Sequence, residues 1–131
     1  MDIATLCNVV RQTAFDIHVY HGTGHLERIY ESALCNRLSK LRIPFVRQCA
    51  IGIYDEDGAP LGDYVADMLV DSSLIVEIKV AHQLSADHEA QMLAYLKASK
   101  VEHGLLVNFG SFRFQVRKYA YTNRRGIVQD G

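Results

Sequence analysis

The chain begins with two stretches in which apolar residues recur at the three- and four-residue spacing of an amphipathic helix. The first covers residues 3–17 and the second covers 26–41. The segment 21–24, which contains two glycines, separates them, and Pro44 follows the second. Because glycine and proline interrupt helices, this pattern predicts two N-terminal helices rather than one long helix.

From residue 45 onward the pattern changes to short apolar runs bounded by turn residues. Residues 45–54 form the first predicted strand, and the acidic, glycine-containing segment 55–60 forms a turn. A later helix is predicted to begin at a cap on Ser85 or Asp87 and to end near Ser99. The other predicted strands cover residues 64–70, 73–80, 104–108 and 112–119. This order predicts an α/β sandwich in which helices flank a central mixed β-sheet.

One predicted strand places two opposite charges among apolar residues. Alternation along residues 73–80 puts Glu77 and Lys79 on the same side as Ile75. The opposite side is apolar and consists of Leu74, Val76, Ile78 and Val80. Burying a carboxylate and an ammonium group is costly without a partner, so the pair indicates a metal site or another function.

A second acid comes from the preceding strand. If residues 71–73 form a three-residue loop, Val70 lies opposite Leu74, and the same register sets Asp67 directly opposite Glu77. Side chains in such positions have Cβ atoms about 5 Å apart. Two carboxylates at that separation repel each other unless a cation lies between them.

These three residues have the D…ExK pattern of a magnesium-dependent phosphodiesterase. Mg²⁺ prefers oxygen ligands, which Asp67 and Glu77 supply, and Mn²⁺ accepts similar ligands. Lys79 can orient or help to deprotonate an attacking water and can offset charge on the phosphate. The alternative is an ordinary strand edge with a solvated glutamate–lysine pair.

Composition predicts one domain covering residues 1–131. The chain is 49% hydrophobic and 22% charged, which is typical of a globular protein with one moderate core. We find no apolar run of about 20 residues and no N-terminal signal pattern, so we expect a cytoplasmic protein without membrane association. The three cysteines, Cys7, Cys35 and Cys49, are far apart and lack metal-ligand spacing, which favours reduced thiols.

Charge is distributed unevenly along the chain. The net charge is −1, yet residues 97–125 contain seven basic residues and only one acid, Glu102. The basic residues are Lys97, Lys100, Arg113, Arg117, Lys118, Arg124 and Arg125. On a strand over 112–119, Arg113 and Arg117 share one face and are candidates for contact with a phosphate backbone. The alternative is a solvated charged strand and tail.

Several further motifs carry a resemblance to a known family. They are Gly24-His25-Leu26-Glu27-Arg28-Ile29-Tyr30, then Gln91-Met92-Leu93-Ala94-Tyr95-Leu96-Lys97, and Gly104-Leu105-Leu106-Val107-Asn108-Phe109-Gly110. Together with the D…ExK residues, they resemble the small bacterial GxxExxY proteins of the PD-(D/E)xK, or restriction-endonuclease-like, nuclease superfamily over about residues 22–118. Ala66 departs from the pattern, because the superfamily has a proline before its aspartate.

The resemblance implies roles for three residues beyond the D…ExK set. Glu27 would join Asp67 and Glu77 as a metal ligand, although a glutamate near a helix start is also favoured by the helix dipole alone. Gln91 and Tyr95 lie four residues apart and share a helix face. They match a Q-x-x-x-Y motif in which the glutamine orders the site and the tyrosine contacts substrate. Without the resemblance they read as a solvent-facing amide and a core aromatic residue.

We therefore expect a nuclease that hydrolyses DNA or RNA, with DNA as the first expectation and with Mg²⁺ or Mn²⁺ as cofactor. The alternative is a module of the same fold that binds nucleic acid or a partner protein without cleaving it. The small size of the chain and its lack of a separate recognition domain favour dependence on a partner protein or a second copy.

Overall fold

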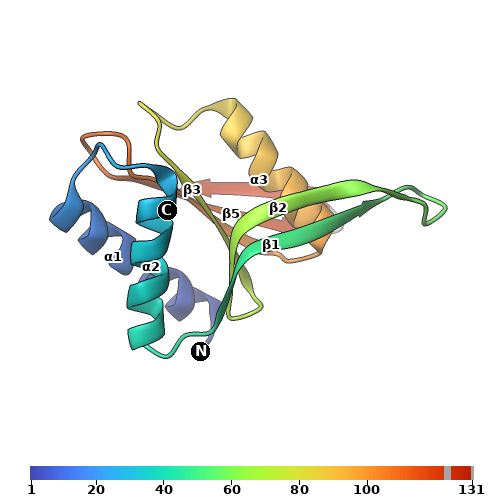
Figure 1. Ribbon diagram of the computed structural model, residues 1–131. Helices are drawn as coiled ribbons and strands as arrows, with labels where there is room; N and C mark the ends of the chain where they lie inside the picture. Colours follow the sequence, from blue (N-terminus) through green and yellow to red (C-terminus); the bar gives the residue numbers. More distant parts are fainter. Residues whose placement is uncertain (123–124, 131) are drawn as a thin grey trace.

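The computed structural model describes residues 1–122 and 125–130 (Figure 1). Its helices are α1 (Ile3–His21), α2 (Glu27–Lys40) and α3 (Ala86–Ser99). Its strands are β1 (Phe45–Tyr54), β2 (Pro60–Val70), β3 (Leu74–Lys79), β4 (His103–Asn108), β5 (Gln115–Thr122) and β6 (Arg125–Asp130). Ser85 caps α3 by accepting a hydrogen bond from the backbone of His88, so one of the two expected caps is confirmed.

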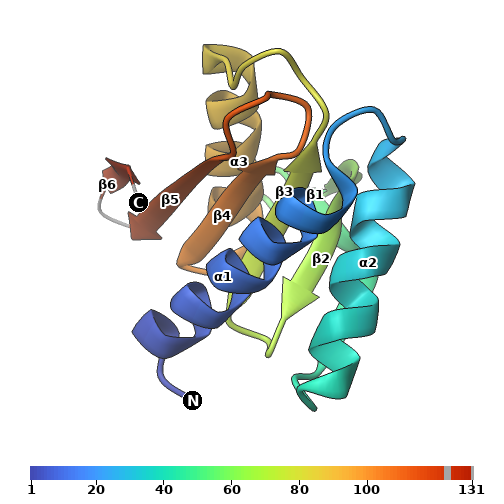
Figure 2. The same ribbon diagram turned by 90° about the vertical axis from the view of Figure 1, so that its left-hand side faces the viewer.

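The six strands form one mixed sheet in the order of the chain. β3 and β4 are parallel and are joined through α3, whereas all other neighbouring strands are antiparallel. Helices α1 and α2 cover one face and α3 covers the other (Figures 1 and 2). The predicted α/β sandwich is therefore confirmed, while β6 was not anticipated.

The two faces of β3 support separate hydrophobic clusters. Leu74, Val76 and Ile78 pack under α1 and α2. Ile75 packs on the other face under α3. The predicted alternation is correct, and Glu77 follows it, since it lies on the same side as Ile75 and is 3% exposed.

The segment between α1 and α2 is held by a buried tyrosine. Gly22 and Gly24 adopt positive φ angles of 67° and 111°, which suit glycine. The hydroxyl of Tyr30 donates to the carbonyl oxygen of Gly22 at 2.6 Å, and its ring stacks on Phe109 with centroids 4.5 Å apart. These contacts fix where α2 begins, and thereby place Glu27 at its first turn.

The last predicted strand begins later than expected. Phe112 is 97% exposed, and the hydroxyl of Ser111 donates to the carbonyl oxygen of Arg113 at 2.6 Å. This local bond folds the backbone into a loop, so β5 starts only at Gln115. The prediction that Arg113 lies on a strand is therefore wrong.

All three cysteines are free, as expected; Cys7 and Cys35 are buried and Cys49 is half-buried. Within the part of the chain that the structure describes, no helix combines the length and the apolar character that a membrane span requires.

Candidate active site

The acidic residues Asp67 and Glu77 lie where β2 and β3 cease to pair and diverge, a place that we call the fork. The ladder between these strands includes only Val70 with Leu74 and the two pairs before it, which confirms the predicted register. Beyond that point the acidic side chains bridge the fork. The N–H of Asp67 donates to Glu77 Oε1 at 2.7 Å, and the N–H of Ile78 donates to Asp67 Oδ2 at 2.8 Å. Each carboxylate thus accepts a backbone N–H from the other strand.

Burial makes this pair hard to ionise. Desolvation and then the charge of Asp67 raise the pKa of Glu77 to about 8. Desolvation also raises the pKa of Asp67, although the bond from Ile78 partly offsets the effect. Near neutral pH the pair therefore retains a proton that a cation would displace.

Lys79 is held beside the acids by α3. Its Nζ donates to Gln91 Oε1 at 2.8 Å and lies 4.0 Å from Glu77 Oε2. The distance between Lys79 Nζ and Glu77 Oε2 corresponds to an electrostatic contact rather than to a hydrogen bond. The structure therefore brings Gln91 to the D…ExK residues, although residues 80–90 separate it from Lys79 along the chain. The amide fixes the direction of the ammonium group.

Tyr95 lies one turn beyond Gln91 and is largely buried. Desolvation and then the charges of Glu77 and Asp67 raise the pKa of its phenol. Its ring contacts that of Tyr64 on β2, with centroids 5.2 Å apart. The structure therefore places Tyr95 within electrostatic reach of both acids.

Glu27 occupies a different position. It is exposed and lines a small polar cleft of about 260 Å³ that Asp67 also lines. Among the residues that the structure describes, no group of three or more acidic, histidine or cysteine side chains is arranged to hold a metal ion. Glu27 thus faces the cleft without completing a three-acid cluster with Asp67 and Glu77.

Two residues of this cleft were missed in the sequence. Glu31 is almost fully buried and accepts hydrogen bonds from Arg47 Nη2 at 2.6 Å and from Gln48 Nε2 at 2.7 Å. Its charge raises the pKa of Asp67, whereas a hydrogen bond from the side chain of Gln48 lowers it. The one available signal for Glu31 was its place four residues after Glu27, on the same helix face.

Gln48 has an unusual backbone that explains the fork. Its φ angle is +48° in the middle of β1, a left-handed conformation that is costly for a side chain other than glycine. Before this point Arg47 reaches toward α2, whereas after it Cys49 lines a pocket beneath α3. β1 therefore changes face at Gln48, and its neighbour β2 changes face at Asp67, between Ala66 and Met68.

The predicted phosphate-binding arginines are separated. Arg113 is exposed in the loop before β5. Arg117 faces α3 and forms an ion pair with Glu89 at 2.7 Å, and the hydroxyl of Tyr119 donates to the same carboxylate. Lys118 points to the opposite side, as expected, and its Nζ lies 2.9 Å from His103 Nδ1. Arg124 lies outside the described residues, and the side chain of Arg125 is not described.

The acids fit a hard divalent cation. Mg²⁺ is commonly bound through one or two carboxylates while it keeps several waters, so Asp67 and Glu77 are sufficient protein ligands. The backbone N–H groups orient both carboxylates, and a cation would stabilise the charged forms that burial disfavours when it raises both pKa values. The donor set therefore matches the chemistry of Mg²⁺ or Mn²⁺.

Comparison with known proteins agrees with this geometry. The family model of the PD-(D/E)XK nuclease superfamily matches residues 4–119, and the chain belongs to this superfamily. The matched range includes Asp67, Glu77 and Lys79. No curated protein and no solved structure gives a significant match.

Proposed function

We propose that the protein hydrolyses phosphodiester bonds of nucleic acid with Mg²⁺ or Mn²⁺ held by Asp67 and Glu77. The observation that carries the proposal is the fork itself, in which the buried carboxylate of Glu77 meets the half-buried carboxylate of Asp67 and Lys79 lies beside them. Membership of a nuclease superfamily supports nucleic acid as the substrate. Of the two nucleic acids, DNA is the first expectation.

In the reaction, the oxygen of water forms a bond to phosphorus while the bond to the leaving sugar oxygen breaks. The water loses a proton and the leaving oxygen gains one. A bound Mg²⁺ supplies positive charge that polarises a phosphoryl oxygen and acidifies water. Lys79 orients the attacking water and offsets negative charge that develops on the phosphate.

The neighbouring residues prepare these groups. Gln91 accepts a hydrogen bond from Lys79 and so holds its ammonium group near Glu77. Tyr95, whose phenol pKa responds to the charges of both acids, contacts the substrate from α3. Glu27 and Glu31 line the adjoining cleft, where Glu27 acts as a further acid for the cation. Arg113 is available in its loop for contact with a phosphate.

A cleavage assay tests the proposal. Purified protein is incubated with Mg²⁺ or Mn²⁺ and with single-stranded, double-stranded and branched DNA and with RNA. We expect metal-dependent products that EDTA and Lys79→Ala abolish. Lys40→Ala, which removes an exposed lysine at the far end of α2, should retain full activity. Cleavage that survives in Lys79→Ala would reject the assigned site.

The second candidate is a module that binds nucleic acid or a partner protein without cleaving it. The separation of Glu27 from a three-acid cluster favours this alternative. It predicts that every substrate in the cleavage assay remains intact at all metal concentrations, while binding persists. If hydrolysis occurs but requires a second copy of the chain, the activity rises more steeply than the protein concentration.

A further inference from the structure

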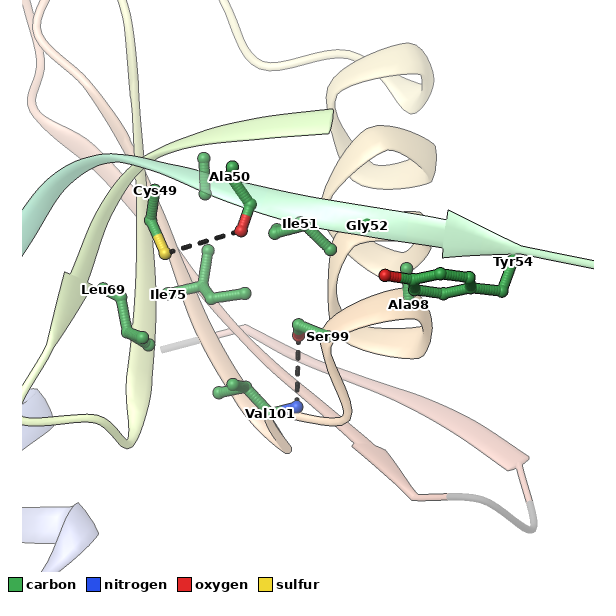
Figure 3. A pocket seen from close by; sticks show the side chains of 11 residues that line it. Cys49, Ala50, Ile51, Gly52, Tyr54, Leu69, Ile75, Ala98, Ser99 and Val101 are labelled. Carbon is green, nitrogen blue, oxygen red and sulfur yellow. Dashed lines mark hydrogen bonds between the residues drawn. The ribbon is translucent and has the colours of Figure 1, made fainter. Parts of the chain in front are cut away.

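A groove runs between the outer part of β1 and the C-terminal half of α3. It consists of two adjoining pockets of about 310 and 480 Å³ that share Gly52, Tyr54 and Ala98. Figure 3 shows the first pocket, with β1 on one side, α3 on the other and the side chains of Leu69 and Ile75 in its floor. We call this surface the β1–α3 groove.

Two tyrosines present their rings along the groove. Tyr54 is 66% exposed and Tyr64 is 41% exposed, and both line the second pocket. The Tyr54 ring folds back over Gly52 (Figure 3), where an added Cβ would come within 2.9 Å of the ring. The absence of a side chain at Gly52 therefore allows this placement. Large aromatic surfaces that remain accessible beside a pocket are suited to stacking.

The rim of the groove is positively charged. Lys97 and Lys100 line the second pocket, at the C-terminal end of α3. Among the described residues, no acidic side chain lines either pocket, and neither lysine forms an ion pair. Aromatic rings interleaved with unpaired basic side chains match the chemistry of bases joined by phosphates.

The groove leads toward the acids of the fork. Tyr64 contacts Tyr95, which lies one turn after Gln91 on α3, and Gln91 accepts a hydrogen bond from Lys79. The second pocket therefore adjoins the helix turn that holds Lys79 in the candidate active site.

We propose that the β1–α3 groove binds an unpaired nucleic-acid strand and directs it to the fork. Tyr54 and Tyr64 stack on bases, and Lys97 and Lys100 contact the phosphates. Bases of a duplex already stack on one another, so their faces are not open to these rings, which makes the groove selective for single strands. The inference rests on the proposed function, to which it adds the class of substrate.

Binding without cleavage provides the test. Fluorescence anisotropy in EDTA measures the affinity for labelled oligothymidylate and for a DNA duplex of equal length. We expect tighter binding of the single strand, a loss of roughly tenfold in Tyr54→Ala, and retained affinity in Tyr54→Phe, because stacking needs the ring and not the hydroxyl. Tyr20→Ala is the matched control, since Tyr20 is 79% exposed on α1, away from the groove.

The lysines have a separate readout. The double change Lys97→Ala, Lys100→Ala should reduce the slope of log affinity against log salt by about 1.4, the value for two lost contacts with a single strand. Lys40→Ala should leave the slope unchanged. An oligoribonucleotide of the same length shows whether the groove distinguishes RNA from DNA.

Several results would overturn the inference. They are absence of binding, preference for the duplex, equal loss in Tyr54→Phe and Tyr54→Ala, or unchanged affinity in all groove variants. A change of oligomeric state in Tyr54→Ala, seen by sedimentation, would identify a second copy as the occupant instead. The experiments also distinguish failure of the proposed function from failure of this inference. Single-strand binding that depends on the groove, without cleavage in Mg²⁺ or Mn²⁺, would reject hydrolysis but leave the groove as a binding site.

Discussion

The carboxylate pair of the fork should make the metal-free protein less stable as pH rises. The pKa of Glu77 is 4.5 in its ordinary setting and about 8 in the fold, because of burial and the charge of Asp67. Between these values the folded chain holds a proton that the unfolded chain has released. The free energy of unfolding therefore falls as pH rises through this window, and the contribution is lost above the folded pKa.

The magnitude follows from the shift. Each pKa unit corresponds to about 1.4 kcal/mol, so the contribution of Glu77 to unfolding changes by about 3 kcal/mol between pH 5 and pH 8. For a chain of this size, that change lowers the melting temperature by roughly 10 °C. The pKa of Asp67 is also raised, so its effect has the same sign.

Glu77→Gln isolates the effect. The glutamine keeps an oxygen that can accept the N–H of Asp67, but it carries no charge and relieves the repulsion. Thermal and urea unfolding in EDTA, followed by circular dichroism at pH 5, 6, 7 and 8, should show a shallower pH slope in the variant. At pH 8 the variant should be at least as stable as the parent and should lack nuclease activity.

Two outcomes would refute this reasoning. Parallel curves for parent and variant would show that Glu77 ionises at an ordinary pH in the fold. A variant that melts well below the parent at every pH would identify Glu77 as a structural ion-pair partner of Lys79. The two residues would then form an ordinary glutamate–lysine pair on a strand. Addition of Mn²⁺ at pH 8 should raise the melting temperature of the parent more than that of the variant.

Three further predictions concern the site and its surroundings. Isothermal titration should detect Mn²⁺ binding that strengthens from pH 6 to pH 8 and that Asp67→Asn abolishes; unchanged binding in this variant would remove Asp67 from the metal site. Gln91→Leu should reduce cleavage at least tenfold with little change in melting temperature, because Lys79 loses its hydrogen-bond partner, and full activity would contradict this positioning role. Arg113→Ala should weaken nucleic-acid binding and reduce the salt slope by about one at unchanged stability, and equal binding by parent and variant would exclude a phosphate contact there. Arg117→Ala should instead cost up to about 1 kcal/mol of stability, because it breaks the ion pair with Glu89.

Local rules were sufficient for most of the helices and strands and for the acidic hairpin. The spacing of apolar residues predicted the two N-terminal helices, a capping residue predicted the start of α3, and alternation along β3 predicted which side Glu77 occupies. The length of the loop at 71–73 determined the register of β2 against β3 and so the proximity of Asp67 to Glu77. These properties depend on neighbours in the chain, which is why a single sequence reveals them.

Other features required the tertiary structure, because their partners are distant in the chain. No sequence pattern predicts the left-handed backbone of Gln48, at which β1 changes the face that its side chains occupy. Burial of Glu31 depends on Arg47 and Gln48 in a different element. The ion pair that occupies Arg117 depends on how α3 packs over β5, where Glu89 reaches the strand. Residue pattern thus determined which chemistry the chain carries, whereas packing between elements decided which charged groups meet, which are buried and which remain open to a substrate.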